Sequence, residues 1–399
     1  MKRLVMTLRS RCWKGVLSFG LLLSACSGSG KLMLGEVLPS DGTGGAGGTG
    51  LAVSDASPGA EDAACVAQDL TALTPALYLV VDRSNDMQLM QQQQSSRWVD
   101  LLDVLARGSG YLLSAAANVW NVGLSYYPNP CSFHPNNCPP TNNPSCSLDS
   151  YRGTNAPNMP IGAPDRVAGF LATSMGPGGP TAMRFALQGA LQTFIPAWEE
   201  ANQNQFVVPV IIAGNSPSDN DCNMMTGTGD VIDVASNAQQ RRLVNTHSRT
   251  FVIGFEPDDN DINDLDNIAE AGGTTQAAII AGQSIQALTT QMTAAFNDIR
   301  QRSCVFQLPP NPTGTFRLRR PNQGSMMPDT VSILPDRSDC DLPDNKDAYN
   351  VYVDSDEQGN SRVIGCDKLC VDYWASASSN GKFQLVPLAC SAITQPPMR

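Results

Sequence analysis

Histidine and clustered basic residues are scarce in this chain. Only two histidines, His134 and His247, occur in 399 residues, which leaves little material for histidine-based catalysis or zinc binding. Lysine and arginine together number 26 against 37 acidic residues, for a formal charge of −11, and no basic patch or arginine-rich run stands out. A nucleic-acid partner is therefore not expected, because such proteins concentrate positive charge on one surface.

Recognisable catalytic motifs are also lacking. The chain has no G-x-S-x-G nucleophile elbow. Its GPGG sequence, residues 176–179, does not follow a strand in the way that a dinucleotide-binding loop requires. Both histidines lie in loop-like contexts without a recognisable nucleophile, and the cysteines are expected to be paired. We therefore predict that the protein is not an enzyme, and an exported hydrolase is retained only as a remote alternative.

Residues 1–25 have the composition of a secretory signal peptide. Five basic residues and no acid occupy residues 1–14, and an apolar stretch too short to span a bilayer comfortably follows at residues 15–25. The sequence Leu-Ser-Ala-Cys at residues 23–26 resembles the bacterial lipobox, in which the cysteine is lipidated and becomes the new N-terminus. Cys26 is therefore the predicted lipidation site. The alternative is an ordinary signal peptide that happens to contain a cysteine.

Residues 26–62 are expected to form a flexible tether, because Gly, Ser, Ala and Asp dominate and there is little to bury. Removal of the five basic residues leaves 21 against 37 acidic ones, so the mature chain carries a formal charge of about −16. That charge provides no attraction to an anionic surface, so the lipid must be the membrane anchor. Ser27 after the cysteine resembles an outer-membrane sorting signal. The predicted location is the cell envelope, lipid-anchored, at the bacterial outer membrane.

The cysteine content fits an oxidising compartment. Of the 12 cysteines, one leaves with the signal peptide and one is the predicted lipidation site, and the even remainder favours disulfides. The connectivity cannot be deduced from the sequence. However, Cys131, Cys138 and Cys146 share one Pro- and Asn-rich loop, so at least one is expected to pair outside it. A zinc knuckle at Cys366 and Cys370 is disfavoured, because no second pair or histidine lies nearby.

Strand and helix patterns alternate between residues 66 and 303. Strand-like apolar runs occupy residues 76–82, 121–128, 205–214, 249–257 and 276–280. Helical patterns occupy residues 95–119, 181–198, 230–245, 261–272 and 284–302. This alternation predicts an α/β domain, doubly wound around a mostly parallel central sheet with helices on both faces. Ligands of such sheets bind at the carboxyl ends of the strands, near the topological switch point.

The first strand ends in a group of oxygen-bearing side chains. Asp82, Ser84 and Asp86 alternate in the sequence VVDRSNDM, residues 80–87. Hard oxygen ligands at a strand end are the kind that a divalent cation such as Mg²⁺ prefers.

Four stretches of the chain carry a resemblance to a known family. They are LYLVVDRSNDM from residue 77, GPGGPTAMRFALQGAL from residue 176, FVIGFEPDDNDINDLDNIAEAGGTTQA from residue 251 and SCVFQLPP from residue 303. With them the chain resembles a von Willebrand factor A-type domain, and more closely the bacterial lipoproteins that carry one. The resemblance covers roughly residues 66–310 and implies a domain at residues 63–303, with a cysteine-containing β-rich region at residues 304–399.

Proteins of this family often carry a metal-ion-dependent adhesion site, built from an Asp-x-Ser-x-Ser turn, a threonine loop and a third loop with an aspartate. The resemblance implies that Asp82, Ser84 and Thr181 match this pattern, that Asp86 replaces the second serine, and that Gly214 stands where the aspartate is expected. Three interpretations stay open. In the first, the site is a relic. In the second, it is a remodelled Mg²⁺ or Mn²⁺ site that uses Asp86. In the third, it takes Asp219 or Asp221 from the following loop as a ligand.

Two other acidic stretches resemble calcium loops less convincingly. Residues 259–270 place acids or amide groups at positions one, three, five and twelve, but Asp264 occupies the position that needs glycine. Acids in the first turn of a helix explain this stretch better. Residues 354–361 are better explained as the turn of a hairpin between residues 349–353 and 362–365. Short strand-like runs and four cysteines after residue 303 predict a small, disulfide-pinned β region packed on the main domain.

The sequence thus predicts a surface-tethered lipoprotein that presents its main domain for protein binding or adhesion, through a remodelled divalent-metal site. The protein ligand is unknown. The alternative is a structural cell-envelope protein with a relic metal site and no metal-dependent ligand.

Overall fold

The computed structural model describes part of the chain between residues 68 and 387. The described residues are 68–70, 72–90, 95–108, 110–114, 120–128, 146–152, 158–174, 176–202, 205–217, 222, 227–239, 249–307, 316–319, 332–334, 340, 349–355, 361–377 and 383–387. The predicted signal peptide, Cys26 and the tether therefore lie outside the described residues, as do both histidines. None of the described helices is long and apolar enough to cross a membrane.

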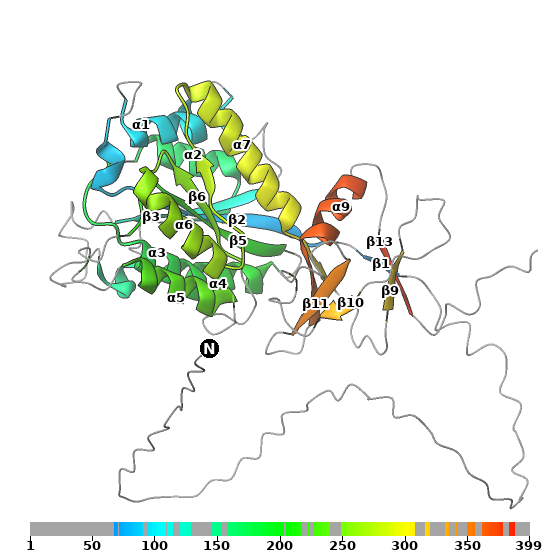
Figure 1. Cartoon of the computed structure of the whole chain (residues 1–399). Helices are drawn as coiled ribbons and strands as arrows, with labels where there is room; N and C mark the ends of the chain where they lie inside the picture. Colours follow the sequence, from blue (N-terminus) through cyan, green and yellow to red (C-terminus); the bar gives the residue numbers. More distant parts are fainter. Residues whose placement is uncertain are drawn as a thin grey trace, which may run out of the picture. The chain divides into compact units, whose positions relative to one another are not determined.

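A six-stranded sheet forms the centre of the main body (Figure 1). Its strands are β2 (Thr74–Asp82), β3 (Asn121–Tyr127), β4 (Asn158–Gly162), β5 (Gln205–Ala213), β6 (Phe251–Phe255) and β7 (Ala278–Ile280). The spatial order is β4-β3-β2-β5-β6-β7, and every neighbouring pair is parallel except β3 with β4. The five parallel strands confirm the five predicted apolar runs. The edge strand β4 was not predicted, because its sequence NMPIG is short and contains a proline.

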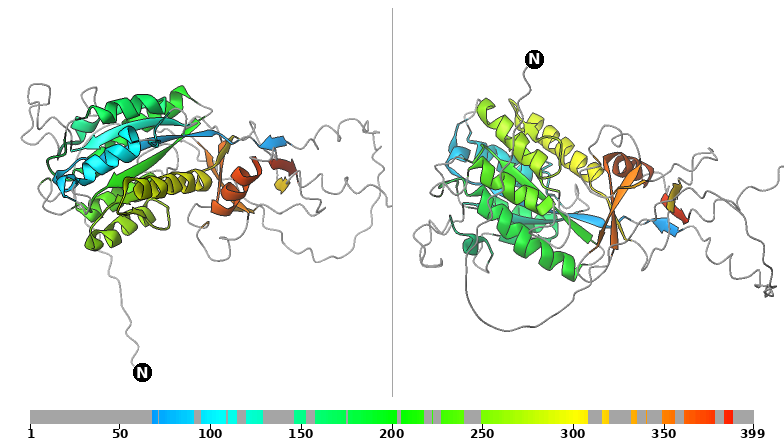
Figure 2. Two further views of the ribbon diagram at one scale, coloured as in Figure 1. Left: turned by 90° about the horizontal axis from the view of Figure 1, so that it is seen from above. Right: turned by 60° about the horizontal axis from the view of Figure 1, so that its bottom comes forward.

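Helices cover both faces of this sheet, as Figure 2 shows from two further directions. One face carries α1 (Arg97–Leu102), α2 (Pro164–Ala172) and α7 (Ile285–Arg302), and the other carries α3 (Met183–Gly189), α4 (Ile195–Ala201), α5 (Thr228–Gln239) and α6 (Asp259–Ala271). Alternate side chains of β2 supply the two cores: Leu77 and Leu79 face the first group, and Tyr78 and Val80 face the second. The predicted mostly parallel α/β sheet with helices on both faces is confirmed.

The first predicted helix is shorter than its periodicity suggested. After α1, the helix continues as one π-helical turn, Asp103–Arg107, and stops at Gly108. A Cβ at Gly108 would lie 2.4 Å from the carbonyl oxygen of Asp103, and Gly110 adopts a φ of +74°. These two glycines turn the chain back, so that the Leu112 amide donates to the carbonyl of Val104 at 3.0 Å. The helix predicted over residues 95–119 therefore ends twelve residues early, at residue 107.

The second predicted helix is also interrupted. Between α3 and α4 lies a π-helical turn, Ala190–Phe194. Pro196, the second residue of α4, has no N–H to donate back to the preceding turn, so the widened turn accommodates the missing bond.

Two smaller sheets lie outside the central sheet. The strands β8 (Val305–Gln307), β10 (Ser332–Leu334), β11 (Asn350–Ser355) and β12 (Ser361–Gly365) form one sheet in the order β10-β11-β12-β8. The strands β1 (Gln68–Leu70), β9 (Phe316–Arg319) and β13 (Phe383–Pro387) form the other, in the order β1-β13-β9. Antiparallel pairing of β11 with β12 confirms the predicted hairpin. Two features differ from the prediction: β1, from the start of the predicted main domain, pairs with β13, and Asp367–Ala377 forms a helix, α9.

Three disulfides join described cysteines: Cys146–Cys222, Cys304–Cys370 and Cys340–Cys366. The first confirms that a cysteine of the 131–146 loop pairs outside it. The other two place Cys366 and Cys370 in separate bridges, which rules out their forming a zinc pair.

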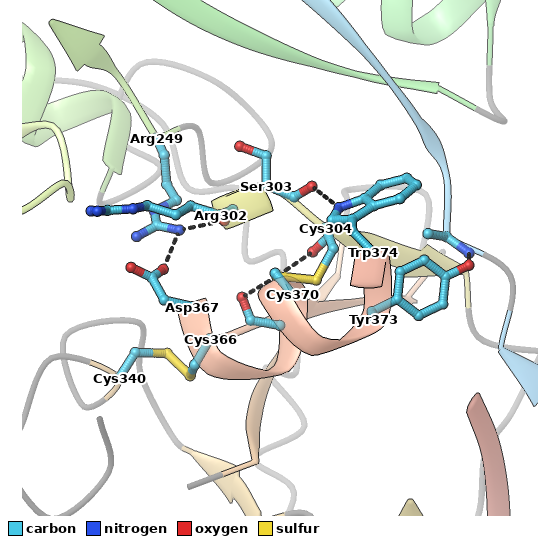
Figure 3. The surroundings of a disulfide bond; sticks show 12 residues. Arg249, Arg302, Ser303, Cys304, Cys340, Cys366, Asp367, Cys370, Tyr373 and Trp374 are labelled. Carbon is cyan, nitrogen blue, oxygen red and sulfur yellow. Dashed lines mark hydrogen bonds and ion pairs between the residues drawn. A yellow bond between two sulfur atoms is a disulfide. The ribbon is translucent and has the colours of Figure 1, made fainter. Parts of the chain in front are cut away.

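The C-terminal region is packed on the main body around the second of these bridges (Figure 3). Cys304 follows directly after α7, and its bond to Cys370 ties α9 to that point. Arg249 forms an ion pair of 2.7 Å with Asp367 and donates to the carbonyl of Arg302 at 2.8 Å. The predicted packing of the region against the main domain is confirmed.

Candidate functional site

Asp82 lies at the topological switch point of the central sheet. It is the last residue of β2, and the chain runs outward from β2 through β3 and β4 on one side and through β5, β6 and β7 on the other. At a switch point, the connections that follow two adjacent strands leave in opposite directions. The loops at these strand ends therefore separate and form a crevice in which ligands bind. Asp82 is completely buried there.

Both oxygens of the Asp82 carboxylate accept backbone hydrogen bonds. The Ser84 amide donates to Oδ1 at 2.8 Å, and the Gly214 amide, from the loop after β5, donates to Oδ2 at 3.1 Å. Burial, with a smaller contribution from the charge of Asp86, nevertheless raises the pKa of Asp82 to about 7, although these hydrogen bonds oppose the rise. The site therefore holds a carboxylate whose negative charge is only partly compensated by the protein.

Ser84 and Tyr127 place two further hydroxyl groups in this region. The Ser84 hydroxyl lies close enough to Asp82 to lower its pKa, but it is buried without a hydrogen bond of normal geometry. Tyr127 pairs with Asp82 in the sheet register, and its buried hydroxyl also has no hydrogen-bond partner. Burial, followed by the charge of Asp82, raises the pKa of Tyr127 well above its ordinary value. The site thus contains neutral oxygen atoms that a ligand could engage.

Asp86 is half-buried on the short 3-10 helix Asn85–Gln88. Its Oδ2 accepts a hydrogen bond of 2.6 Å from the side-chain amide of Asn215. Because Asn215 follows Gly214, the loops after β2 and β5 are joined twice, once at Asp82 and once at Asp86.

The threonine loop lies against the loop after β2. The Gly178 amide donates to the carbonyl of Arg83 at 2.8 Å, the Asn85 amide donates to the carbonyl of Gly179 at 3.0 Å, and the Gly179 amide donates to the Asn85 side chain at 3.1 Å. Thr181 follows this contact and is buried, two residues before α3 begins. The structure therefore brings together the loops that carry Asp82, Ser84, Asp86 and Thr181.

The third loop differs from a metal-binding arrangement. A Cβ at Gly214 would lie 2.5 Å from Sδ of Met87, a fully buried side chain, and 3.5 Å from Cδ of Arg97. Arg97 itself is buried and donates to the carbonyl of Gly214 at 3.0 Å. A methionine and an arginine therefore fill the space into which a side chain at residue 214 would project.

The buried side chain of Arg97 belongs to a charged cluster that the sequence interpretation missed. It pairs with Asp258 at 2.7 Å, and it lowers the pKa of Glu256. Burial, followed by the charge of Asp100, has the larger opposite effect and raises the pKa of Glu256 to about 7. Glu256 follows β6 with a φ of +50°, in the left-handed region that residues other than glycine rarely adopt. Strained residues of this kind often lie at functional sites. No local sequence signal marked the cluster, because its members come from α1 and from the end of β6.

The remaining predicted residues are accounted for as follows. Asp219 and Asp221 lie outside the described residues, so the third interpretation of the metal site stays a prediction. The EF-hand-like stretch is helical from Asp259 onward, as α6, which confirms the helix-entry interpretation. In the part of the chain that the structure describes, no three His, Cys, Asp or Glu side chains converge as a metal-binding group.

Comparisons with known proteins do not identify a family. No family model matches the chain, and no curated protein matches it. Among solved structures, the pilus adhesin SpaC from Lactobacillus rhamnosus GG aligns with a TM-score of 0.36 and 10% identity, over 80% of this chain and 40% of that one. The PilB minor pilin from Streptococcus sanguinis aligns with a TM-score of 0.34 and 12% identity, over 57% of this chain and 61% of that one. The chain thus spans less than two thirds of either structure. Likenesses this weak establish neither a family nor a function.

Proposed function

We propose that this protein is a lipid-anchored protein of the bacterial outer membrane, which presents a von Willebrand factor A-like domain for binding another protein. The binding face is the edge of the sheet at which β2, β5 and β6 end. The observation that carries the proposal is the position of Asp82, buried at the switch point and bonded to the loops after β2 and β5. A site assembled from loops of distant sequence at this edge is the usual ligand site of an α/β sheet.

Two forms of the proposal differ in whether the site takes a metal. In the first, Asp82, Ser84, Asp86 and Thr181 would hold Mg²⁺ or Mn²⁺. The partly compensated charge of Asp82 and the buried Ser84 hydroxyl beside it support this form. The metal would supply an open coordination position for a carboxylate of the protein ligand.

In the second form, the metal site is a relic, and the protein is a structural component of the envelope without a metal-dependent ligand. Met87 and Arg97 support this form, because they occupy the space beside Gly214 in which a third-loop carboxylate would stand. The Arg97 guanidinium also places a fixed positive charge beside the carbonyl of Gly214. These residues fit a metal less well than the loops after β2 and before α3 do.

A binding experiment with the full chain tests the proposal. The purified lipoprotein, immobilised in detergent, is incubated with native envelope extract in Mg²⁺ or in EDTA, and retained proteins are identified and then titrated individually. We expect one protein to bind saturably to the natural chain and to lose binding with Asp82→Asn. The matched control is Asp298→Asn, which changes an exposed carboxylate on α7. Equal binding by natural chain and Asp82→Asn in both buffers would reject the binding face, and dependence on Mg²⁺ would select the first form.

A further inference from the structure

Large apolar side chains are exposed mainly in one short stretch of the described residues. Four such side chains are exposed among the described residues, and three lie within eleven residues of sequence: Leu89 at 45%, Met90 at 66% and Val99 at 40%. The fourth, Val371 at 39%, belongs to α9 in the C-terminal region. Single exposed apolar residues are ordinary on protein surfaces, but a group of them marks an interaction site more often. We call Leu89, Met90 and Val99 the apolar corner.

The backbone holds the apolar corner in a fixed arrangement. The Leu89 amide donates to the carbonyl of Asp86 at 3.2 Å, and the Arg97 amide donates to the carbonyl of Leu89 at 3.2 Å. Met90 forms an isolated antiparallel bridge with Ser96. The Ser96 side chain then caps α1 by accepting from the Val99 amide at 3.4 Å. A ligand would therefore meet a preorganised surface, and binding would lose less conformational entropy than binding to a flexible loop.

Two acidic residues are connected by hydrogen bonds to the segments that carry the apolar corner. Asp86 lies one turn before Leu89 and is linked to Asn215. Asp258, 64% exposed, is held by Arg97 at the start of α1, the helix that carries Val99.

The same acidic border continues along the strand ends. Ser216, next to Asn215, donates to Asp261 in the first turn of α6 at 2.6 Å, and the exposed Asp259 lies in that turn as well. Arg97 adds little positive charge to the surface, since its side chain is 3% exposed and is engaged with Asp258 and the carbonyl of Gly214. The corner is therefore an apolar surface with an acidic edge.

We propose that the apolar corner docks a segment of a partner protein in which apolar side chains are flanked by lysine or arginine. The inference rests on the proposed binding function and adds the chemistry of its ligand. Apolar side chains of the segment would cover Leu89, Met90 and Val99, and its cations would face Asp86 and Asp258. Charge complementarity of this kind selects partners and accelerates their encounter. The acidic edge argues against an anionic membrane surface as the occupant, because like charges repel there.

Fluorescence anisotropy with the full chain in detergent tests this inference. The probes are labelled synthetic peptides with one apolar centre, flanked by lysines, by glutamates or by serines. We expect the lysine peptide to bind most tightly of the three. The double variant Leu89→Ser/Met90→Ser should lower the affinity for this peptide by about tenfold or more, because apolar anchors are lost. Val371→Ser is the matched control, because it removes an equally exposed apolar side chain from a different surface.

A pair of charge variants keeps the test decisive if the double variant folds poorly. Met90 is 66% exposed, so either charge can be placed there without loss of a buried contact. Met90→Lys is expected to lower the affinity for the lysine peptide more than Met90→Glu does. Added salt is expected to reduce this difference in affinity between the two variants. Equal affinity of the two variants, or a preference of the natural chain for the serine peptide, would overturn the inference.

The remaining outcomes separate this inference from the proposed function. Metal-dependent binding of the glutamate peptide would support the first form of the proposed function and reject a basic ligand. An envelope protein could require Asp82 for binding and still bind the double variant Leu89→Ser/Met90→Ser as tightly as the natural chain. This result would support the proposed function and reject the apolar corner as the docking site. Binding to anionic vesicles in preference to the lysine peptide would reject a protein segment as the occupant. Absence of binding to every peptide and every envelope protein would reject both.

Discussion

The amide of Gly214 donates a hydrogen bond of 3.1 Å to Oδ2 of Asp82, across 132 residues of sequence. It closes the loops after β2 and β5 over a buried carboxylate, and it does so with a residue that has no side chain. The sulfur of Met87 occupies the adjacent space, 2.5 Å from where a Cβ would stand. This packing leads to the first prediction.

Gly214→Ala is expected to lower the free energy of unfolding by about 1–3 kcal/mol, because an added methyl group overpacks the buried site. The cost should be smaller in a Met87→Ala background, in which the opposing sulfur is gone. Urea denaturation of the four chains measures the coupling. Gly229→Ala serves as the control, since a Cβ there meets nothing within 4 Å. Equal costs of Gly214→Ala in both backgrounds would contradict the packing argument.

Magnesium binding is expected to be weak but measurable by calorimetry in the natural chain, absent in Asp82→Ala and weaker in Asp86→Ser. The reason is that a divalent cation relieves the repulsion between two nearby carboxylates. The usual composition of a von Willebrand factor A-type metal site requires Asp86→Ser together with Gly214→Asp. Because Met87 fills the space beside residue 214, Met87→Ala is also needed to make room for the new aspartate. This triple variant should bind more tightly than the natural chain. Heat from the triple variant alone would identify the natural site as a relic, and no heat from either would refute the assignment of Gly214.

Stability is expected to fall as pH rises between about 4.5 and 7. Burial and Asp100 raise the pKa of Glu256 from 4.5 to about 7, so within this window the folded chain keeps a proton that the unfolded chain has lost. Asp82, with a pKa raised to about 7, acts in the same direction. Glu256→Gln should therefore show a shallower decline in unfolding free energy over this range, measured by denaturation at several pH values. The control Asp298→Asn should keep the natural slope; a Glu256→Gln slope equal to the natural one would contradict this explanation.

All ten cysteines after Cys26 are expected to be paired in the mature protein. Six of them already form three bridges in the described residues, and each bridge commonly contributes about 2–4 kcal/mol. Thiol counting on the denatured, unreduced protein should find no reactive cysteine, and the reduced protein supplies the positive control. Two or more free thiols would reject the fully paired arrangement.

Membrane attachment is expected to depend on Cys26. Cys26→Ser should abolish lipid labelling and release the protein into the soluble fraction, because the lipid is the anchor that the sequence predicts. Fractionation after a high-salt wash measures the effect, and Cys12→Ser, which changes a cysteine of the predicted signal peptide, is the control. Continued pelleting of the Cys26→Ser protein with membranes would show that another anchor exists.

Local sequence patterns were sufficient for most of the main body. Buried parallel strands such as β2 and β5 are continuous apolar runs, and helices such as α6 and α7 repeat their apolar positions every three to four residues, so their signals lie within a few neighbouring residues. The same patterns placed Asp82 at a strand end. Where local signals conflicted with special backbone needs, as at Gly108 and Pro196, the predicted helices were too long or lacked their π-helical turns.

Only the tertiary structure decided what surrounds Asp82. Sequence periodicity says where a strand ends, but it does not say which distant loop will cover that end. The meeting of Gly214, Met87 and Arg97 depends on β5 lying beside β2 and on α1 lying over that edge. The partners of Cys304 and Cys340, and the left-handed backbone of Glu256, likewise depend on long-range packing. The sequence by itself therefore determined the helices and strands of the main body and the position of Asp82 at a strand end. The tertiary structure decided which charged and polar groups surround Asp82, because interactions between residues remote in sequence leave no local pattern.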